Sequence, residues 1–473
     1  MVFRGATLID GTGAPSLPNS AIVIEGGQIT QVTRADSLVV PSRARVVDVT
    51  GKWIIPGLID FHVHTSAFSN PGGERYRSPF LRPLLAYGVT TVRDTGTVPD
   101  AISQYMRNSG DPSIAMPAVF GCGPILDGQP PYWPSSMSWG LATVDEARAA
   151  VDKVADAGFW GVKAYIGLST AVTAAIVEQA KKRGLPVTMH ASSSPFGVTQ
   201  AQALKLGVDG LEHAFVAIPN LSSRISLLTN RQLDQQVAGL GSAARALAVW
   251  RSIYGAWSGV DLDSPTTQQF IRSVAEAKVP WTLTLAVSER HTLLDQSDMT
   301  STPAYAFVPA VTQASWGTAL PPSRWSGDEA AAVQQGFERM LEFVGMAHAA
   351  GVRIIAGSDM PNPYVVPGAS LHQELKLLVR AGPSPMDALR SATAKPAEVL
   401  GQGAHIGTLE AGKQADLVVL DGDPLKDINN VDNIVQVMRQ GRSYDPAQLL
   451  TVSASDMQLF ASAPVGSGVC CCA

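Results

Sequence analysis

The sequence predicts an α/β fold, in which a (β/α)8 TIM barrel carries a small β-sandwich domain built from both ends of the chain. Apolar segments with the length of strands follow one another, and most are separated by segments of helical composition. Further strand-like segments flank this array on both sides. The predicted barrel strands cover residues 54–64, 90–95, 116–121, 161–166, 186–191, 210–215, 279–285 and 352–358.

The segments between these strands carry helix signals. A helix is predicted from Thr143 to Ala157, with Asp145 and Glu146 in its first turn, and another over 170–183. Alternation of strands and helices with short connections gives a parallel sheet, and eight such units close as a barrel. In that fold the residues at the C-terminal ends of the strands carry out the chemistry.

The domain boundaries follow from the same pattern. Residues 1–56 and 402–445 read as β-strands, and we expect them to form one β-sandwich because neither piece has enough strands for a core alone. The barrel occupies residues 57–401. Residues 446–473 form a C-terminal tail that ends in Cys470–Cys472, and we expect its end to be disordered.

Two barrel connections are unusually long, residues 216–263 and 286–328. Loops of this length are uncommon unless they have a function, so we interpret both as a lid and specificity wall on the catalytic face. Partly helical packing is the alternative interpretation. The aromatic residues expected to form the wall are Trp250, Trp257, Trp316 and Trp325.

Composition excludes several classes of function. The net charge of −5 provides no basic surface for nucleic acid, so we expect no such partner. No stretch of about 18 apolar residues is present, so no membrane helix is expected. Four cysteines exclude a disulfide framework. The N-terminus lacks the apolar core of a signal peptide, which predicts a cytoplasmic protein, or a secreted one only if a leader has been removed.

The strand ends carry residues that bind metals. His62 and His64 alternate at the end of the first barrel strand, so both imidazoles point to the same side. Four more candidates each end a separate strand, and core packing alone does not explain such a set. They are Lys163, His190, His213 and Asp359.

The residue types fit metal chemistry. Neutral imidazoles suit zinc and similar divalent ions, and Asp359 can bind an ion while exchanging a proton with water. Lys163 cannot bind a cation as an ammonium group. Burial in an apolar strand beside metals lowers the pKa of a lysine, however, and carbon dioxide converts the free amine to a carbamate that can bridge two ions. A buried ion pair is the alternative for Lys163.

This set resembles the amidohydrolase superfamily, specifically its binuclear branch with a carbamylated lysine. The segments 351–359, 371–382 and 407–421 are also similar to that family. Within it, the chain looks most like the group of prolidase-like carboxypeptidases, ochratoxin-type amidases and imidazolonepropionase relatives. The resemblance implies that His62, His64 and Asp359 bind a first ion, that His190 and His213 bind a second, and that carbamylated Lys163 bridges them. Zinc is the expected metal, with manganese or cobalt as alternatives.

The function implied by the resemblance is hydrolysis of a small-molecule amide (C–N) bond in an N-acyl amino acid, a dipeptide or an aryl amide. Asp359 would act as the acid-base group. A lactonase or esterase activity and a cyclic amide hydrolase or deaminase, as in imidazolonepropionase, are the alternatives. A deaminase commonly has a glutamate three residues after the fifth-strand histidine, where this chain has Ser193. A homo-oligomer is a further expectation.

Substrate-binding residues are less well defined. Tyr165 lies two residues after Lys163, so its phenol is predicted to point inward and hold a carbonyl or carboxylate; a core tyrosine is the alternative. Arg93, Arg290 and His291 are candidates for binding a substrate anion. For each of these three, a structural or surface salt bridge is the competing interpretation.

Overall fold

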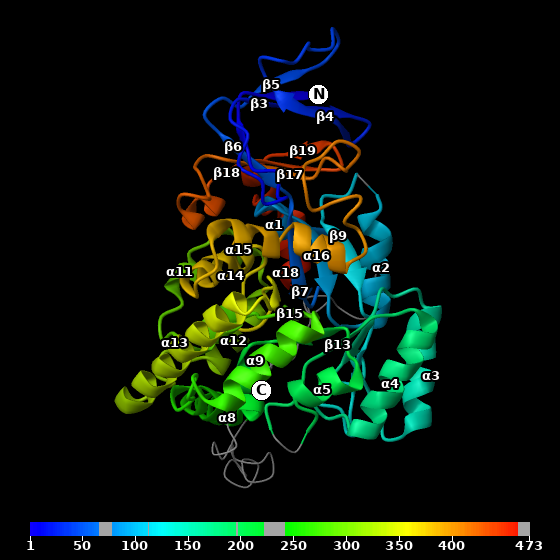
Figure 1. Cartoon of the computed structure of the whole chain (residues 1–473), viewed down its shortest axis with the longest axis vertical. Helices are drawn as coiled ribbons and strands as arrows, with labels where there is room; N and C mark the ends of the chain where they lie inside the picture. The colour runs from blue at the N-terminus through cyan, green and yellow to red at the C-terminus, as the bar shows by residue number, and fades with distance from the viewer. Residues whose placement is uncertain (66–77, 112, 195–196, 222–241, 462–473) are drawn as a thin grey trace.

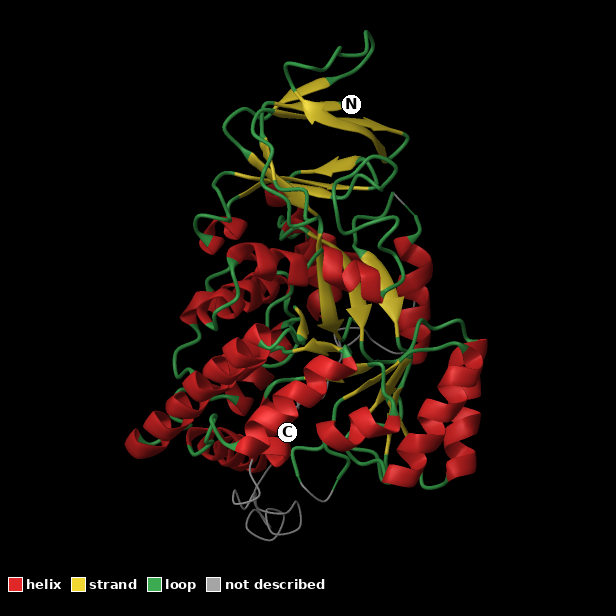
Figure 2. Cartoon of the chain, in the orientation of Figure 1, coloured by secondary structure: helices red, strands yellow, loops and turns green. Residues whose placement is uncertain are grey.

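The computed structural model describes residues 1–65, 78–111, 113–194, 197–221 and 242–461. Small sheets occupy one end of the elongated molecule, and parallel strands surrounded by helices fill the rest (Figure 1). The strands from the two ends of the chain lie together in the small domain, which is at the top of this view (Figures 1 and 2).

The larger part contains two parallel sheets. A seven-stranded sheet has the order β11-β10-β12-β13-β14-β15-β16, and a three-stranded sheet has the order β7-β8-β9. Every predicted barrel strand overlaps an observed one, although most are shorter than predicted. The strands are β7 (Leu58–Val63), β8 (Val89–Asp94), β9 (Ala118–Gly121), β10 (Ile125–Asp127), β11 (Ser138–Gly140), β12 (Val162–Ala164), β13 (Val187–Met189), β14 (Gly210–Glu212), β15 (Pro280–Thr282) and β16 (Arg353–Ile355).

Backbone hydrogen bonds join the two sheets beyond the end of β16. The Phe61 amide donates to Ala356 O at 3.2 Å, and the Asp359 amide donates to His62 O at 2.7 Å. These bonds bring the segment after β16 alongside β7. The strands β10 and β11 were not predicted, because they are short and lie in a segment rich in glycine and proline.

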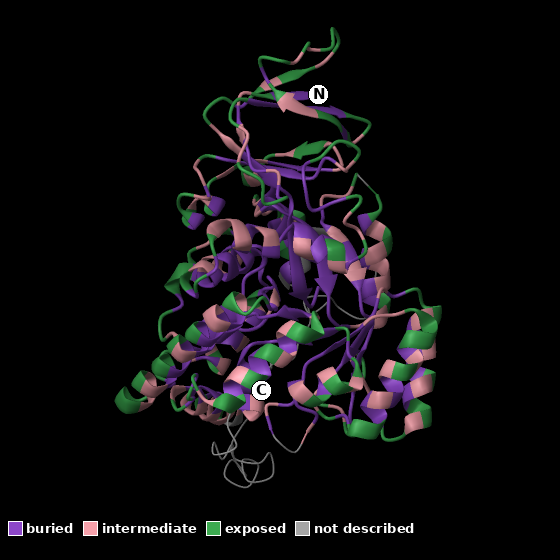
Figure 3. Cartoon of the chain, viewed as in Figure 1, coloured by how far each residue is buried: buried purple, intermediate pink, exposed green. Residues whose placement is uncertain are grey.

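Helices cover the parallel strands, which are mostly buried, and many of these helices bury one face and expose the other (Figure 3). The two predicted helices are confirmed: Thr143 caps the first with a capping box, and Gly184 ends the second with a φ of 70°. The first of the helices are α1 (Arg82–Ala86), α2 (Pro99–Ser109), α3 (Val144–Asp156), α4 (Thr170–Arg183), α5 (Gln200–Leu206), α6 (Ile218–Leu221), α8 (Ser242–Ser258) and α9 (Pro265–Ala277). The later ones are α10 (Leu285–Thr292), α11 (Ser297–Thr300), α12 (Ala310–Ala319), α13 (Gly327–Ala349), α14 (Ala369–Arg380), α15 (Pro385–Ser391), α16 (Ala394–Val399), α17 (Pro446–Leu449) and α18 (Ala454–Ala461). Among the described residues, no helix combines the length and apolarity that a membrane crossing needs.

The small domain consists of a four-stranded sheet, β4-β3-β1-β5, and a five-stranded sheet, β19-β18-β17-β6-β2. Phe3 and Ile22 from the first sheet share an apolar cluster with Ile54, Leu417 and Met438 from the second. One core therefore joins the strands from both ends of the chain. These strands are β1 (Val2–Arg4), β2 (Thr7–Leu8), β3 (Ser20–Glu25), β4 (Gln28–Arg34), β5 (Val46–Asp48), β6 (Trp53–Pro56), β17 (Leu417–Leu420), β18 (Ile434–Arg439) and β19 (Arg442–Tyr444).

The first part of the C-terminal tail is folded. Helices α17 and α18 occupy it, and Asp456 pairs with Arg82 at 2.6 Å. The rings of Phe460 and Phe80 lie 5.0 Å apart. These contacts attach α18 to the larger part of the molecule. The expectation for Cys470–Cys472 lies outside the described residues.

The two long connections are partly helical. Within 216–263 the structure describes α6 and α8, and within 286–328 it describes α10, α11 and α12. Their four tryptophans are 0% to 6% exposed. The prediction that these rings form an aromatic wall around the substrate is wrong, because they pack into the apolar cores between helices.

Candidate metal centre

The predicted ligands meet at the C-terminal ends of the parallel strands. His62 lies on β7 and Lys163 on β12, while His190, His213 and Asp359 directly follow or lie just beyond β13, β14 and β16. All of these side chains are buried. Candidate ligand atoms of His62, His213 and Asp359 lie within 4.8 Å of one another. The structure thus brings together residues separated by almost 300 positions in the sequence.

Asp359 lies at the centre of the histidines. Its Oδ1 is 3.1 Å from His64 Nε2 and 3.4 Å from His62 Nε2, and its Oδ2 is 3.8 Å from His213 Nδ1. The imidazole of His190 packs against that of His213, with 4.2 Å between ring centroids. The four histidines therefore form one continuous group with the carboxylate.

Backbone strain is concentrated at this site. His213, Thr284 and Asp359 have φ values of 60°, 50° and 61° after their respective strands. Residues other than glycine rarely adopt this left-handed conformation, and surrounding contacts must maintain it. The turns direct the side chains of His213 and Asp359 back toward the site.

Hydrogen bonds orient three of the imidazoles. Nδ1 of His62 lies 2.7 Å from Glu212 Oε2, and Nδ1 of His64 lies 2.6 Å from Gly96 O. Nδ1 of His213 lies 2.8 Å from Thr284 Oγ1. Metal-binding histidines use such partners to fix the tautomer and the ring orientation. Among the described residues, Nε2 of His62 has no hydrogen-bond partner, whereas Nε2 of His64 contacts Asp359.

Burial keeps the histidines neutral. It holds the pKa of His62, His190 and His213 well below the usual value, and the positive charge of Lys163 acts in the same direction. His64 differs, because burial lowers its pKa but the adjacent Asp359 raises it by more. Three neutral imidazoles and a carboxylate are a donor set that suits zinc and similar ions.

Lys163 is a buried amine in the middle of the site. Its side chain is 1% exposed, and among the described residues its Nζ has no hydrogen-bond partner. Burial lowers the pKa of Lys163, against the opposing attraction of Glu212. An unpartnered buried amine is costly unless another group completes the site. His62 Nε2 is likewise without a hydrogen-bond partner in the described part of the chain, so the residues present fit a bound metal.

The close approach of β7 and the segment after β16 explains why residue 357 is a glycine. A Cβ atom at Gly357 would lie 2.8 Å from His62 Cβ and 2.9 Å from His62 N. Any larger residue would push the segment after β16 away from β7. Gly357 therefore allows Asp359 and His62 to reach the same point.

Glu212 is a functional residue that we did not predict. It is fully buried and accepts hydrogen bonds from Thr188 and from Arg93 Nη2, the latter at 2.6 Å, in addition to its contact with His62. Burial alone would raise its pKa, but Arg93 and Lys163 lower it, so it remains a carboxylate. A lone acid in the short apolar strand before His213 was the available sequence signal.

Arg93 therefore has a structural role. Its Nε donates to Phe61 O at 2.7 Å, its guanidinium lies over the Phe61 ring at 3.9 Å, and it pairs with Glu212. With 2% exposure, it does not reach the mouth of the site. The prediction that Arg93 binds a substrate anion is corrected here: the competing interpretation, a structural salt bridge, describes it.

The side chains of Arg290 and His291 are also in contact with other residues of the protein. Arg290 pairs with Glu289 and Asp298, and it is 1% exposed. The His291 ring stacks on Trp250 with 3.7 Å between centroids. Arg290 is thus a buried ion pair rather than an available anion site. His291 belongs to an aromatic stack that continues through Trp250 to Phe215, beside His213.

Tyr165 lies next to the metal ligands. Its ring is 4.7 Å from that of His190, and its hydroxyl accepts a hydrogen bond from Trp133 Nε1 at 3.2 Å. The inward direction predicted from the spacing after Lys163 agrees with this position. With 3% exposure, the ring is also part of the local packing.

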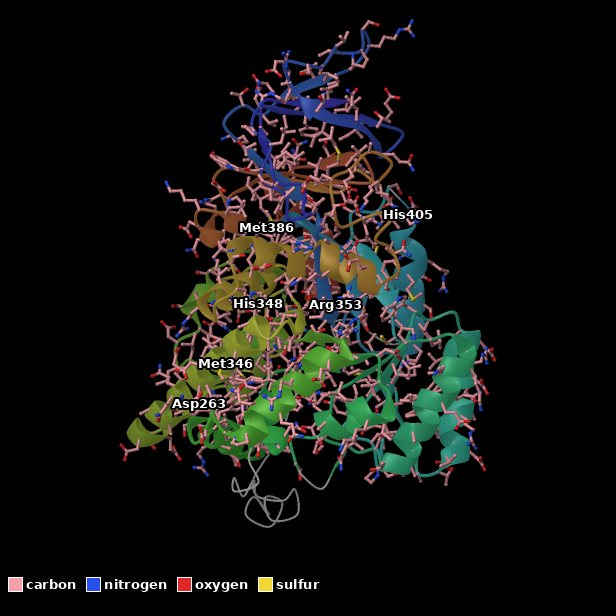
Figure 4. All side chains as sticks on the ribbon, viewed as in Figure 1. Asp263, Met346, His348, Arg353, Met386 and His405 are labelled. Atoms are coloured by element: carbon pink, nitrogen blue, oxygen red, sulfur yellow. The ribbon has the colours of Figure 1, made fainter. Side chains whose placement is uncertain are left out.

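The other histidines lie elsewhere. His348, on α13, faces Asp387 at 3.7 Å, and His405 is exposed on the loop after α16. Figure 4 labels both residues, on different parts of the molecule. His372 contacts Asp432 and the Tyr87 carbonyl. None of these three belongs to the candidate centre.

Comparison with known proteins gives consistent results. The chain is 31% identical over 135 residues to an uncharacterized protein of Mycobacterium tuberculosis, a match that spans 27% of this chain and only 20% of that relative. It is 24% identical over 437 residues to a dihydroorotase of Pelotomaculum thermopropionicum, with 89% of each chain covered. A solved structure of a putative prolidase from Bifidobacterium longum aligns with a TM-score of 0.66, 24% identity and 97% coverage of both chains.

The family assignment rests on a broader match. The profile of the Amidohydrolase family matches residues 53–217 and 331–443, which make up more than half of the chain. These ranges include all six predicted metal ligands, and the long connections fall mostly between them. The resemblance predicted from the sequence is confirmed: the chain belongs to the Amidohydrolase family.

Proposed function

We propose that this protein hydrolyses an amide bond in a small molecule, using two divalent metal ions held at the ends of the parallel strands. We further propose that these strands close as a (β/α)8 barrel and that the two small sheets form a β-sandwich. N-acyl amino acids, dipeptides and aryl amides are the proposed substrates.

The environment of Lys163 carries this proposal. A buried lysine would ordinarily be paired with a carboxylate. Here Nζ has no hydrogen-bond partner in the described part of the chain, and its lowered pKa favours the free amine. The amine can attack carbon dioxide, forming an N–C bond and releasing one proton. The resulting carbamate offers two oxygens to two ions.

The proposed ligands divide into two sets. His62, His64 and Asp359 would hold one ion, and His190 and His213 the other, with carbamylated Lys163 between them. Bound there, the two ions would acidify a water molecule and polarise the substrate carbonyl. Zinc fits the imidazole and carboxylate donors, and manganese or cobalt are alternatives.

Asp359 is the proposed proton carrier. Its buried carboxylate lies among the histidines, where it can accept the proton of the attacking water. A C–O bond forms as the C–N bond breaks, and the same carboxyl delivers the proton to the departing nitrogen. Tyr165, beside His190, is proposed to orient the substrate carbonyl or carboxylate.

The comparisons support amides as the candidate substrates. The solved structures that align along almost the whole chain include a putative prolidase and a Xaa-Pro dipeptidase. The dihydroorotase relative, which also spans most of the chain, favours a cyclic amide as the second candidate substrate. The proposed partner is thus a small molecule; a cytoplasmic location and a homo-oligomer remain predictions.

The test is a substrate screen of the metal-loaded protein. N-acyl amino acids, X-Pro dipeptides, aryl amides, cyclic amides and lactones would be compared by amine release or ring opening. We expect metal-dependent cleavage of at least one linear amide, lost in Asp359→Asn and kept in His348→Gln, whose site is remote. Cleavage of only lactones or cyclic amides would overturn the proposal for linear amides.

A further inference from the structure

A carboxyl group from α14 lies at the start of α10. Glu374 is fully buried, and its Oε2 accepts a hydrogen bond from the Ala286 amide at 2.8 Å. The Leu285 amide is a second donor to this carboxyl. Its other oxygen has no hydrogen-bond partner among the residues that the structure describes. Glu374 therefore satisfies the first free amides of a neighbouring helix.

The N-cap residue of α10 is directed elsewhere. Thr284 occupies the N-cap position, where a threonine hydroxyl usually accepts a hydrogen bond from the first turn. Here the hydroxyl makes no cap and instead lies 2.8 Å from His213 Nδ1. Glu374 accepts from the Ala286 amide, which is one of the two amides that an N-cap side chain usually binds. Glu374 thus takes over the task of the N-cap side chain, while the Thr284 hydroxyl contacts His213.

The backbone of Thr284 requires this support. Its φ of 50° is unfavourable for a β-branched residue. Such a conformation persists only where surrounding contacts maintain it. By anchoring the next two residues, Glu374 holds the start of α10 in the position that presents the Thr284 hydroxyl to His213.

We propose that Glu374 is a positioning residue for the metal ligand His213, acting through α10 and Thr284. This inference rests on the proposed function, because it assigns His213 to an ion. The contact of the hydroxyl with Nδ1 holds the orientation of the His213 ring. Burial raises the pKa of Glu374 to about 8, with Asp60 and Glu289 acting in the same direction, so the group is a neutral acid at neutral pH.

The variants separate hydrogen bonding from volume. Glu374→Gln keeps an acceptor of the same length, Glu374→Met keeps the length without an acceptor, and Glu374→Asp withdraws the carboxyl. Thr284→Val removes the hydroxyl at constant shape. Ser384→Ala is the matched control, because Ser384 caps α15 through the Asp387 amide and lies outside the proposed site.

The primary measurement is binding of zinc to the metal-free protein, by titration against a competing chelator. We expect Glu374→Met and Thr284→Val each to weaken the second zinc by about 10- to 100-fold, as for other partners of metal-bound histidines. The double variant should be no weaker than Thr284→Val alone. Glu374→Gln and Ser384→Ala should bind both ions like the wild type.

Several outcomes would overturn this role. Wild-type affinity for the second zinc in folded Glu374→Met contradicts it, as does an effect in the double variant equal to the sum of the two single effects. If Glu374→Met fails to fold, Glu374→Asp with unchanged affinity has the same meaning. Failure of the wild type to bind a second zinc would instead contradict the proposed function.

Discussion

Replacement of Arg93 by methionine tests the internal support of the metal centre. Arg93 and Glu212 are 2% and 0% exposed, and their charged atoms are 2.6 Å apart. Removing one partner of a buried pair leaves an uncompensated charge, which typically costs about 3–5 kcal/mol. Phe61 O also loses its donor. Methionine retains apolar contact with the Phe61 ring, so we expect a net loss within that range.

The assay is urea unfolding of the metal-free protein, followed by tryptophan fluorescence. Arg34→Met is the control, because Arg34 and Asp36 form an ion pair in which both side chains are about half exposed. Solvent screens such pairs, so this control should keep the unfolding midpoint of the wild type. The Arg93→Met midpoint should fall clearly below both.

Two results would refute the reasoning about Arg93. A stability loss no larger than that of Arg34→Met would show that Glu212 does not depend on its cation. If Arg93→Met had the stability of the wild type but a raised KM for substrates that carry a carboxylate, Arg93 would be a substrate-binding residue.

The remaining predictions concern four further positions. Because the folded-state pKa of Glu374 is about 8 against an ordinary 4.5, this group makes the free energy of unfolding fall as pH rises between these values. Urea titrations should therefore show that the stability of Glu374→Gln rises relative to that of the wild type across this window, by about 5 kcal/mol in total. Gly357→Ala, which places a methyl group against His62, should weaken zinc binding in chelator competition, and unchanged affinity would contradict the close approach. Lys163→Met should lose the second ion and most activity, with partial rescue of Lys163→Ala by short carboxylates plus bicarbonate; an undiminished rate would exclude the carbamate. Asp359→Asn should lower kcat by about 10² to 10⁴ with little change in substrate binding, and near-normal kcat with weak binding would assign it another role.

The metal-binding residues at the strand ends could be predicted because their positions depend on local sequence patterns. Each predicted barrel strand is an apolar segment, and alternation or termination of that segment places His62, His190 and Asp359 at one edge. Parallel strands then align their C-terminal ends without further information. Membership of the Amidohydrolase family follows from the same residues.

Contacts between strands were not predictable from local patterns. Glu212 pairs with Arg93, 119 positions away, and with His62, 150 positions away, so only the folded arrangement shows that it supports the site. Likewise, a sequence cannot show that Thr284 has a positive φ and turns its hydroxyl to His213. The four tryptophans were assigned to an aromatic wall around the substrate because composition does not distinguish an aromatic lining from aromatic packing between helices.

Metal content tests the central claim most directly. Protein loaded with zinc in the presence of bicarbonate, then freed of unbound ions, would be analysed by elemental mass spectrometry against protein concentration. A binuclear centre with carbamylated Lys163 predicts about two zinc ions per chain in the wild type and about one in Lys163→Met. One ion in both proteins, or none, would contradict the account of a binuclear amide hydrolase.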